Sequence, residues 1–231
     1  GNYVEALTMG DQAGNNGGTG TVTNQGQRLS PYISKQKEIG LKYDRKNIGF
    51  TVSAFSTEKP FGIYENTGGS NYVFTAGGTQ QNDNLEFLVF GEPMKGTKII
   101  GGITLLNAEI TNSPGGTNTG KRAIGTAPLL ANLGLTQKIS GVNGLSVSGR
   151  LVYTDARYAN IENTLKVPAS TRVDVGAEYL TSFGKNLLTI RANIENLTDK
   201  NHWSGVGGYP GAGYLVLGNP RTLSISGTLD F

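Results

Sequence analysis

Apolar and polar residues alternate one by one along many stretches of this 231-residue sequence. In the final stretch, Leu223, Ile225, Leu229 and Phe231 alternate with Thr222, Ser224, Ser226, Thr228 and Asp230. Successive side chains of a β-strand point to opposite faces, so this pattern predicts a strand with one apolar and one polar face. No stretch of helical periodicity competes with it, and the sequence predicts an all-β fold.

The alternation recurs until about ten strands are predicted, each near the length that a tilted strand needs to cross a bilayer. The other apolar stripes lie in 3–8, 39–43, 50–54, 85–89, 99–105, 129–135, 145–153, 173–179 and 188–194. The sequence predicts short turns at 44–47, 92–96, 140–144 and 182–186, and long polar loops at 10–31, 59–71, 111–128, 158–169 and 199–220. Short turns at one end and long loops at the other are typical of outer-membrane barrels.

Composition excludes several other classes of protein. Hydrophobic residues are only 36% of the chain and glycine supplies 35 positions, which suits one apolar face better than a thick two-sided core. The net charge is +3 with scattered Lys and Arg, which disfavours nucleic-acid binding. Disulfides and thiolate metal sites are excluded because the chain has no Cys. No run approaches the roughly 18 apolar residues of a membrane helix.

Alternation alone does not distinguish a membrane barrel from a soluble sandwich. The polar stripes carry Glu38, Lys42, Glu86, Arg150, Asp174, Arg191 and Glu195. A basic residue facing lipid costs about 2 to 4 kcal/mol, so these charges must face a wet lumen. Tyr43, Tyr153 and Tyr179 lie on the apolar stripe toward strand ends, where an aromatic girdle forms. These features predict a transmembrane antiparallel up-and-down β-barrel in the outer membrane, in contact with lipid.

Four stretches resemble TonB-dependent siderophore receptors of the outer membrane. They are SKQKEIGLKYD (34–44), GTQQNDNLEFLVFGEP (78–93), GKRAIGTAPLLANLGL (120–135) and RANIENLTDKNHW (191–203), in the order that the family shows. The resemblance implies import of ferric siderophore, energised through TonB, by a barrel of 22 strands with an N-terminal plug. It also implies that residues 1–231 are the C-terminal part of that barrel, without plug or TonB box, and that terminal Phe231 is read by the barrel-assembly machinery.

The resemblance also indicates where the ligand binds, because the siderophore of such receptors lies against lumen and loop side chains. The candidates are Phe61, Tyr64, Tyr72, Arg122, His202, Trp203, Tyr209 and Tyr214. Rings and cations can hold a planar or anionic chelate by stacking and charge. The alternative for Trp203 and Tyr214 is an interfacial anchor. The ferric ion arrives already chelated, so no metal site or cofactor is expected. The pattern of motifs resembles that of receptors for hydroxamate siderophores.

Two other functions are weighed against import. His202 and Ser204 would need hydrogen-bond reach and a third orienting group to catalyse a reaction. Their proximity in a Gly-rich loop supplies neither, so we expect no enzyme. A passive outer-membrane pore, or a structural barrel without active transport, is the remaining alternative.

Ten strands leave two edges, and unpaired backbone groups in hydrocarbon cost several kcal/mol each. Because the count is even, we expect residues 3–9 to pair with 222–231 and close a narrow barrel, with edge-to-edge pairing of two copies as the alternative. Arg150, Asp174, Arg191 and Glu195 are then expected to pair across the lumen. Removing Phe231 should impair insertion of the parent receptor without changing its ligand affinity.

Overall fold

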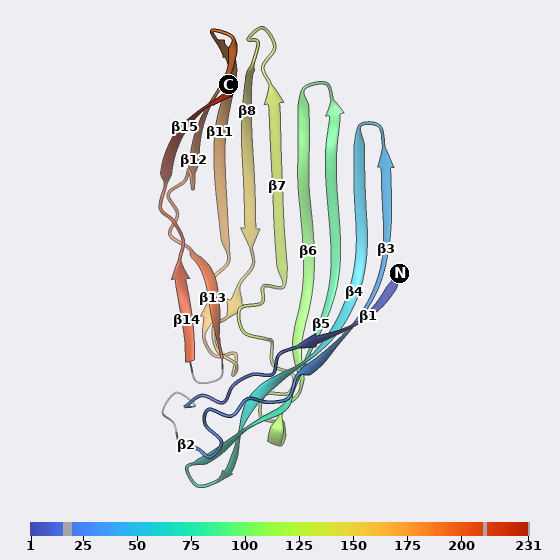
Figure 1. Cartoon of the computed structure of the whole chain (residues 1–231), viewed down its shortest axis with the longest axis vertical. Helices are drawn as coiled ribbons and strands as arrows, with labels where there is room; N and C mark the ends of the chain where they lie inside the picture. The colour runs from blue at the N-terminus through green and yellow to red at the C-terminus, as the bar shows by residue number, and fades with distance from the viewer. Residues whose placement is uncertain (16–19, 210–211, 231) are drawn as a thin grey trace.

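The computed structural model, which describes residues 1–15, 20–209 and 212–230, is dominated by one antiparallel sheet (Figure 1). Its neighbouring strands are β1 (Asn2–Thr8), β3 (Tyr32–Arg45), β4 (Ile48–Gly68), β5 (Asn71–Met94), β6 (Thr97–Asn112), β7 (Leu129–Lys138), β8 (Leu145–Thr154), β11 (Ser170–Phe183), β12 (Asn186–Glu195) and β15 (Thr222–Asp230). Each long strand pairs with the next along the chain. The predicted all-β, up-and-down arrangement is therefore confirmed.

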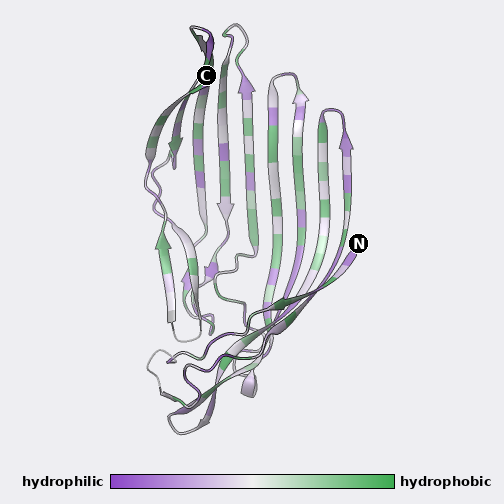
Figure 2. Ribbon diagram, in the orientation of Figure 1, coloured by the Kyte–Doolittle hydropathy of each residue, from purple (hydrophilic) through white to green (hydrophobic). Residues whose placement is uncertain are grey.

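The strand register places the predicted apolar stripes on one face of the sheet. Tyr43 lies opposite Phe50, which lies opposite Val89. Farther along, Leu133 lies opposite Leu151. A slip of one residue would move a whole stripe to the other face. Figure 2 shows the resulting alternation of apolar and polar bands along the strands.

In the part of the chain that the structure describes, the apolar face covers no protein core. Leu133, Leu151 and Ile190 are 39% to 43% exposed, which is what residues facing lipid require. The buried hydrophobic residues gather instead among the long loops, in one cluster around Phe74 and another around Ile110. The sheet is thus a single layer whose apolar side is suited to a membrane.

Among the described residues, no helix is long and apolar enough to cross a membrane.

The short turns all lie at one end of the sheet, together with the C-terminal end of β15 (Figure 1). They join β3 to β4, β5 to β6, β7 to β8 and β11 to β12, as predicted. Tyr43 and Tyr179 lie toward this end, whereas Tyr153 is near the end of β8 that leads into a long loop. The outward tyrosines therefore mark both borders of the apolar band.

The prediction of a loop at 59–71 was wrong, because β4 and β5 run on for 21 and 24 residues. Their hairpin turns at Gly69, whose φ of 59° suits glycine. The extension is stabilised by burial of Ile63 and Phe74 and by β2 (Thr21–Val22), which pairs parallel with β5. Such long-range contacts are not visible in local composition.

The other long segments also contain structure. The expected 158–169 loop is bounded by the paired strands β9 (Arg157–Tyr158) and β10 (Lys166–Val167). The expected 111–128 loop contains the 3-10 helix η2 (Pro114–Gly116). The expected 199–220 loop contains a hairpin of β13 (Trp203–Tyr209) and β14 (Ala212–Leu217).

The prediction of a closed ring was also wrong. Within the described ranges, β1 pairs with β3 alone and β15 with β12 alone, so the two edges stay open on opposite sides (Figure 1). In a barrel of 22 strands each strand accounts for about 16° of the circle, so ten strands trace roughly 160°. Strands shaped for the wide cylinder cannot close a narrow one. Phe231 lies outside the described residues, and the expectation about its removal stays a prediction.

Candidate functional site

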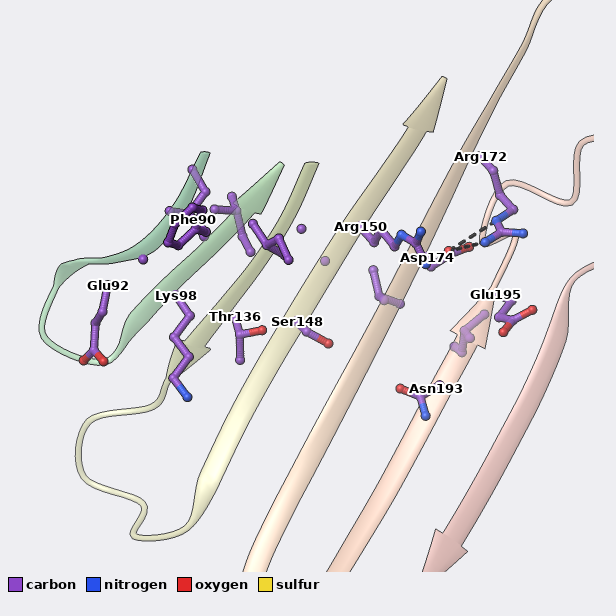
Figure 3. Close-up of a pocket in the computed structure, with 18 residues that line it drawn as sticks. Phe90, Glu92, Lys98, Thr136, Ser148, Arg150, Arg172, Asp174, Asn193 and Glu195 are labelled. Carbon is purple, nitrogen blue, oxygen red and sulfur yellow. Dashed lines mark hydrogen bonds and ion pairs between the residues drawn. The ribbon is translucent and has the colours of Figure 1, made fainter. Parts of the chain in front are cut away.

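A groove of about 740 Å³ hollows the polar face of the sheet (Figure 3). Its wall runs from Phe90 on β5 to Glu195 on β12, across the four intervening strands β6, β7, β8 and β11. Arg150 and Asp174 face each other in register on β8 and β11. The groove thus has Phe90 together with Glu92 and Lys98 toward one end, and further charged side chains on β8, β11 and the end of β12.

Asp174 is the most constrained charge in the groove. Its Oδ2 accepts a hydrogen bond from Nη2 of Arg172 at 3.0 Å, and its Oδ1 accepts one from the backbone N–H of Asn196 at 2.9 Å. The Asp174 side chain is only 14% exposed. These contacts fix the carboxylate in the wall of the sheet.

The charges do not pair across the lumen, and that expectation was wrong. Arg191 instead pairs with Glu178 on the neighbouring strand, with Nε and Oε2 2.8 Å apart. The open sheet brings no opposite wall within reach, so pairs form between neighbours on one wall. Arg150 and Glu195 are exposed and, within the described part of the chain, form no ion pair.

A second cavity, of about 500 Å³, lies among the long loops. Its lining residues are Asp11, Gln12, Gly14, Phe61, Gly62, Tyr64, Phe74, Gln80, Ile110, Ala123, Ile124 and Ile161. Asp11 is the charged member of this set, and its Oδ2 accepts hydrogen bonds from the Tyr32 hydroxyl at 3.2 Å and from the Gly62 N–H at 3.0 Å. The remainder of the lining offers apolar groups, aromatic rings, amides and backbone, which suits an uncharged ligand.

Residues 11–14 form one wall of this loop cavity, and the chain around them is bound to the β4–β5 hairpin. Asn24 donates to the carbonyl of Phe74 at 2.8 Å and accepts from its N–H at 2.9 Å. The hydroxyl of Tyr64 accepts the N–H of Gly14 at 3.0 Å, and the rings of Tyr64 and Phe74 lie 4.7 Å apart. Two of the candidates, Phe61 and Tyr64, therefore share this cavity.

Tyr72 and Arg122 lie near the loop cavity without lining it. Tyr72 packs against the cluster that contains Phe74. Asn163 holds the backbone of Arg122: its Oδ1 accepts the Arg122 N–H at 2.7 Å, and its Nδ2 donates to the Arg122 carbonyl at 3.0 Å. This clamp joins the 111–128 and 158–169 segments.

The last candidates lie in or beside the β13–β14 hairpin, away from the lining of the loop cavity. The ring of His202 lies against Gly218, with Nδ1 3.1 Å from the Lys200 carbonyl oxygen. Tyr214 is 63% exposed, while the side chain of Tyr209 is outside the described part of the structure. The eight candidates therefore do not form one site.

The β13–β14 hairpin is braced by a buried cation. Arg157, only 5% exposed, donates from Nη2 to the carbonyl of Trp203 at 2.9 Å. Burial lowers the pKa of the Arg157 guanidinium below its usual value.

Ser204 donates to the carbonyls of Val216 and Leu217 rather than to His202. The two side chains that raised the question of catalysis are thus each held by backbone atoms.

The most buried polar side chain belongs to Asn196, which the sequence reasoning missed. It is 1% exposed, and its Nδ2 donates to the carbonyls of Lys200 and Asn219, while its Oδ1 accepts the Lys200 N–H, all at 3.0 Å. Its φ of 51° is one that asparagine tolerates better than most residues. Its position directly after a strand and before a turn was the available signal.

Comparison with known proteins agrees with this architecture. The family model described as "TonB dependent receptor-like, beta-barrel" matches residues 1–197. The ferrichrome receptor FcuA of Yersinia enterocolitica is 35% identical over 230 residues, covering 100% of this chain and 30% of that protein. The crystal structure of BauA, the ferric preacinetobactin receptor of Acinetobacter baumannii, superposes with a TM-score of 0.83 at 36% identity, covering 99% of this chain and 33% of that one.

The sheet, its apolar band and its loop-bearing end define a segment of an outer-membrane β-barrel. The chain belongs to the TonB-dependent receptor family, whose members are receptors and transporters rather than enzymes. It spans about a third of the length of the relatives above. The polar face of the sheet is therefore the lumen wall of a larger barrel.

Proposed function

We propose that the chain forms part of a receptor that binds a ferric siderophore at the cell surface and imports it with energy supplied through TonB. The observation that carries this proposal is the loop cavity that Phe61 and Tyr64 line at the loop end of a family barrel. The relatives FcuA and BauA are named as receptors for ferrichrome and ferric preacinetobactin, which supports a siderophore as ligand. TonB would act through a plug encoded outside these residues.

A hydroxamate siderophore suits the loop cavity best. Three hydroxamates neutralise a ferric ion, whereas three catecholates leave a net charge of −3. No Lys or Arg is among the described residues that line the cavity, and the carboxylate of Asp11 lies there. An anionic chelate would meet no compensating cation and one like charge.

The remaining partners follow from the family and the apolar band. The ferric ion is cargo held by its own chelator, so the proposal includes no resident cofactor or protein ligand for the metal. Outer-membrane lipid would cover the apolar face, and the barrel-assembly machinery would insert the complete protein. A passive pore stays the alternative, because the lumen wall exposes unpaired Arg150 and Glu195.

Replacing Phe61 and Tyr64 by alanine in the complete receptor should weaken binding of a ferric hydroxamate by about tenfold or more, since ring contacts are removed. Tyr64→Phe should have a smaller effect, because it keeps the ring and loses only the contact with Gly14. The measurement is titration of purified receptor by intrinsic fluorescence. Tyr214→Ala, which alters an exposed ring outside the cavity, is the matched control.

Unchanged affinity in a folded Phe61→Ala, Tyr64→Ala double variant would contradict this site. Uptake of the ferric hydroxamate by cells with and without TonB separates the two functions. Uptake that needs TonB supports the importer, and equal uptake in both strains supports the passive pore.

A further inference from the structure

The loop cavity has a carboxylate in its wall and, among the described residues that line it, no cation. Asp11 supplies the carboxylate, and neither of the two ion pairs in the described part of the chain involves it. Arg28, whose backbone is bridged to that of Gln12, donates from Nη1 to the carbonyl of Gly10 at 3.1 Å instead. Within the described ranges, the negative charge of Asp11 therefore has no cation of the protein as its partner.

The Asp11 side chain is held in place, yet one of its oxygens remains available. Its Oδ2 accepts from the hydroxyl of Tyr32 at 3.2 Å and from the N–H of Gly62 at 3.0 Å. Among the described residues no group donates a hydrogen bond to Oδ1, and Asp11 is exposed. A positively charged group that enters the cavity would therefore meet a carboxylate that is already oriented.

Aromatic rings lie beside this carboxylate. A β-carbon on Gly62 would clash with the ring of Phe74, and the N–H of the same glycine binds Asp11. The carboxylate and the ring therefore meet at one residue. The ring of Tyr64 lies 4.7 Å from that of Phe74, and Phe61 also lines the cavity. Aromatic rings attract cations electrostatically and alkyl chains by apolar contact, so rings around a carboxylate suit an alkylammonium group.

We propose that the loop cavity selects a ferric chelate that carries a protonated amine, which Asp11 and the neighbouring rings bind. The inference rests on the proposed function and narrows its ligand to a neutral ferric trihydroxamate core with one alkylammonium arm. Primary alkylamines are protonated at pH 7, as the side chain of lysine is. The apolar part of the lining suits the neutral core, and the ammonium group would donate a charge-assisted hydrogen bond to Asp11. A chelate without the amine would desolvate the carboxylate and leave its charge uncompensated.

The test compares two chelates that differ by one charge. Ferrioxamine B is a ferric trihydroxamate with one primary amine, and its N-acetyl derivative is the same chelate without the positive charge. Both are titrated into the purified complete receptor and followed by intrinsic fluorescence. We expect ferrioxamine B to bind about tenfold more tightly, because only its amine can pair with Asp11.

The variant Asp11→Asn removes the charge and keeps an oxygen that can accept from Tyr32 and Gly62. The preference for ferrioxamine B should fall to about twofold or less, through weaker binding of that chelate rather than of the acetylated one. Glu65→Gln is the matched control, because it removes the charge of an exposed residue on the same hairpin that does not line the cavity. This control should keep the full preference.

Equal affinity of the unaltered receptor for the two chelates would overturn the inference without reference to any variant. It would also be overturned if Asp11→Asn weakened both chelates by the same factor, because Asp11 would then act only on the structure of the loop. Loss of the preference in Glu65→Gln as well would show a general effect of charge and not a site. Equal binding of both chelates refutes the amine site alone, whereas binding of neither refutes the ferric hydroxamate as ligand.

Discussion

Asn196→Asp in the complete receptor should lower the free energy of unfolding by roughly 3 to 5 kcal/mol. The substitution replaces an amide that donates to two carbonyls with a carboxylate that cannot donate, at a position that is 1% exposed. The buried charge would face the carbonyl oxygens of Lys200 and Asn219. Urea unfolding in detergent or lipid, followed by gel mobility of the heat-modifiable barrel, measures the loss.

The control for this variant is Asn193→Asp, three residues earlier on the exposed lumen wall, which should change stability by less than about 0.5 kcal/mol. Asn196→Gly adds a second comparison, because glycine accepts the φ of 51° but loses all three side-chain hydrogen bonds. The loss of unfolding free energy for Asn196→Gly should lie between the losses for Asn193→Asp and Asn196→Asp. Equal stability of Asn196→Asp and Asn193→Asp would show that the Asn196 side chain does not hold the 196–200 turn to the segment at Asn219.

Leu133→Arg should destabilise the inserted receptor by about 2 to 4 kcal/mol, because it places a cation near the centre of the lipid-facing band. Leu133 lies midway along β7, opposite Leu151, and is 41% exposed on the apolar face. Asn132→Arg changes the preceding residue, which faces the lumen, and should cost far less. Reversible unfolding from lipid vesicles compares the two. Similar losses for both variants would argue that the two faces do not differ in environment.

The features that the sequence predicted well are those that follow from alternation. The stripes of Leu133, Leu151 and Ile190 needed no long-range information, because a strand that crosses lipid must present an apolar residue at every second position. The short turns followed from the gaps between stripes. The register follows because a slip of one residue would move an apolar stripe away from the lipid-facing side. The predicted faces are therefore continuous from strand to strand.

The loops and the candidate site were predicted only in part, because they depend on contacts between distant residues. Phe61 and Tyr64 share a cavity because Asn24 binds the backbone of Phe74, 50 positions away. Nothing near residue 61 indicates that the strand continues there. The curvature of the sheet, which leaves β1 and β15 too far apart to pair, is likewise a property of the whole barrel and cannot be predicted from a single strand.

The asparagine clamps have a consequence for how ligand preference can change. Asn24 and Asn163 each satisfy both backbone polar groups of a residue in another segment, Phe74 and Arg122, and use no atom of that residue's side chain. The hydrogen bonds of these clamps therefore do not depend on which side chain stands at the clamped position, although the buried ring of Phe74 also packs in the cluster that supports the hairpin. Ligand preference can therefore change through cavity-lining side chains such as Phe61, while the clamp hydrogen bonds keep the loops in place.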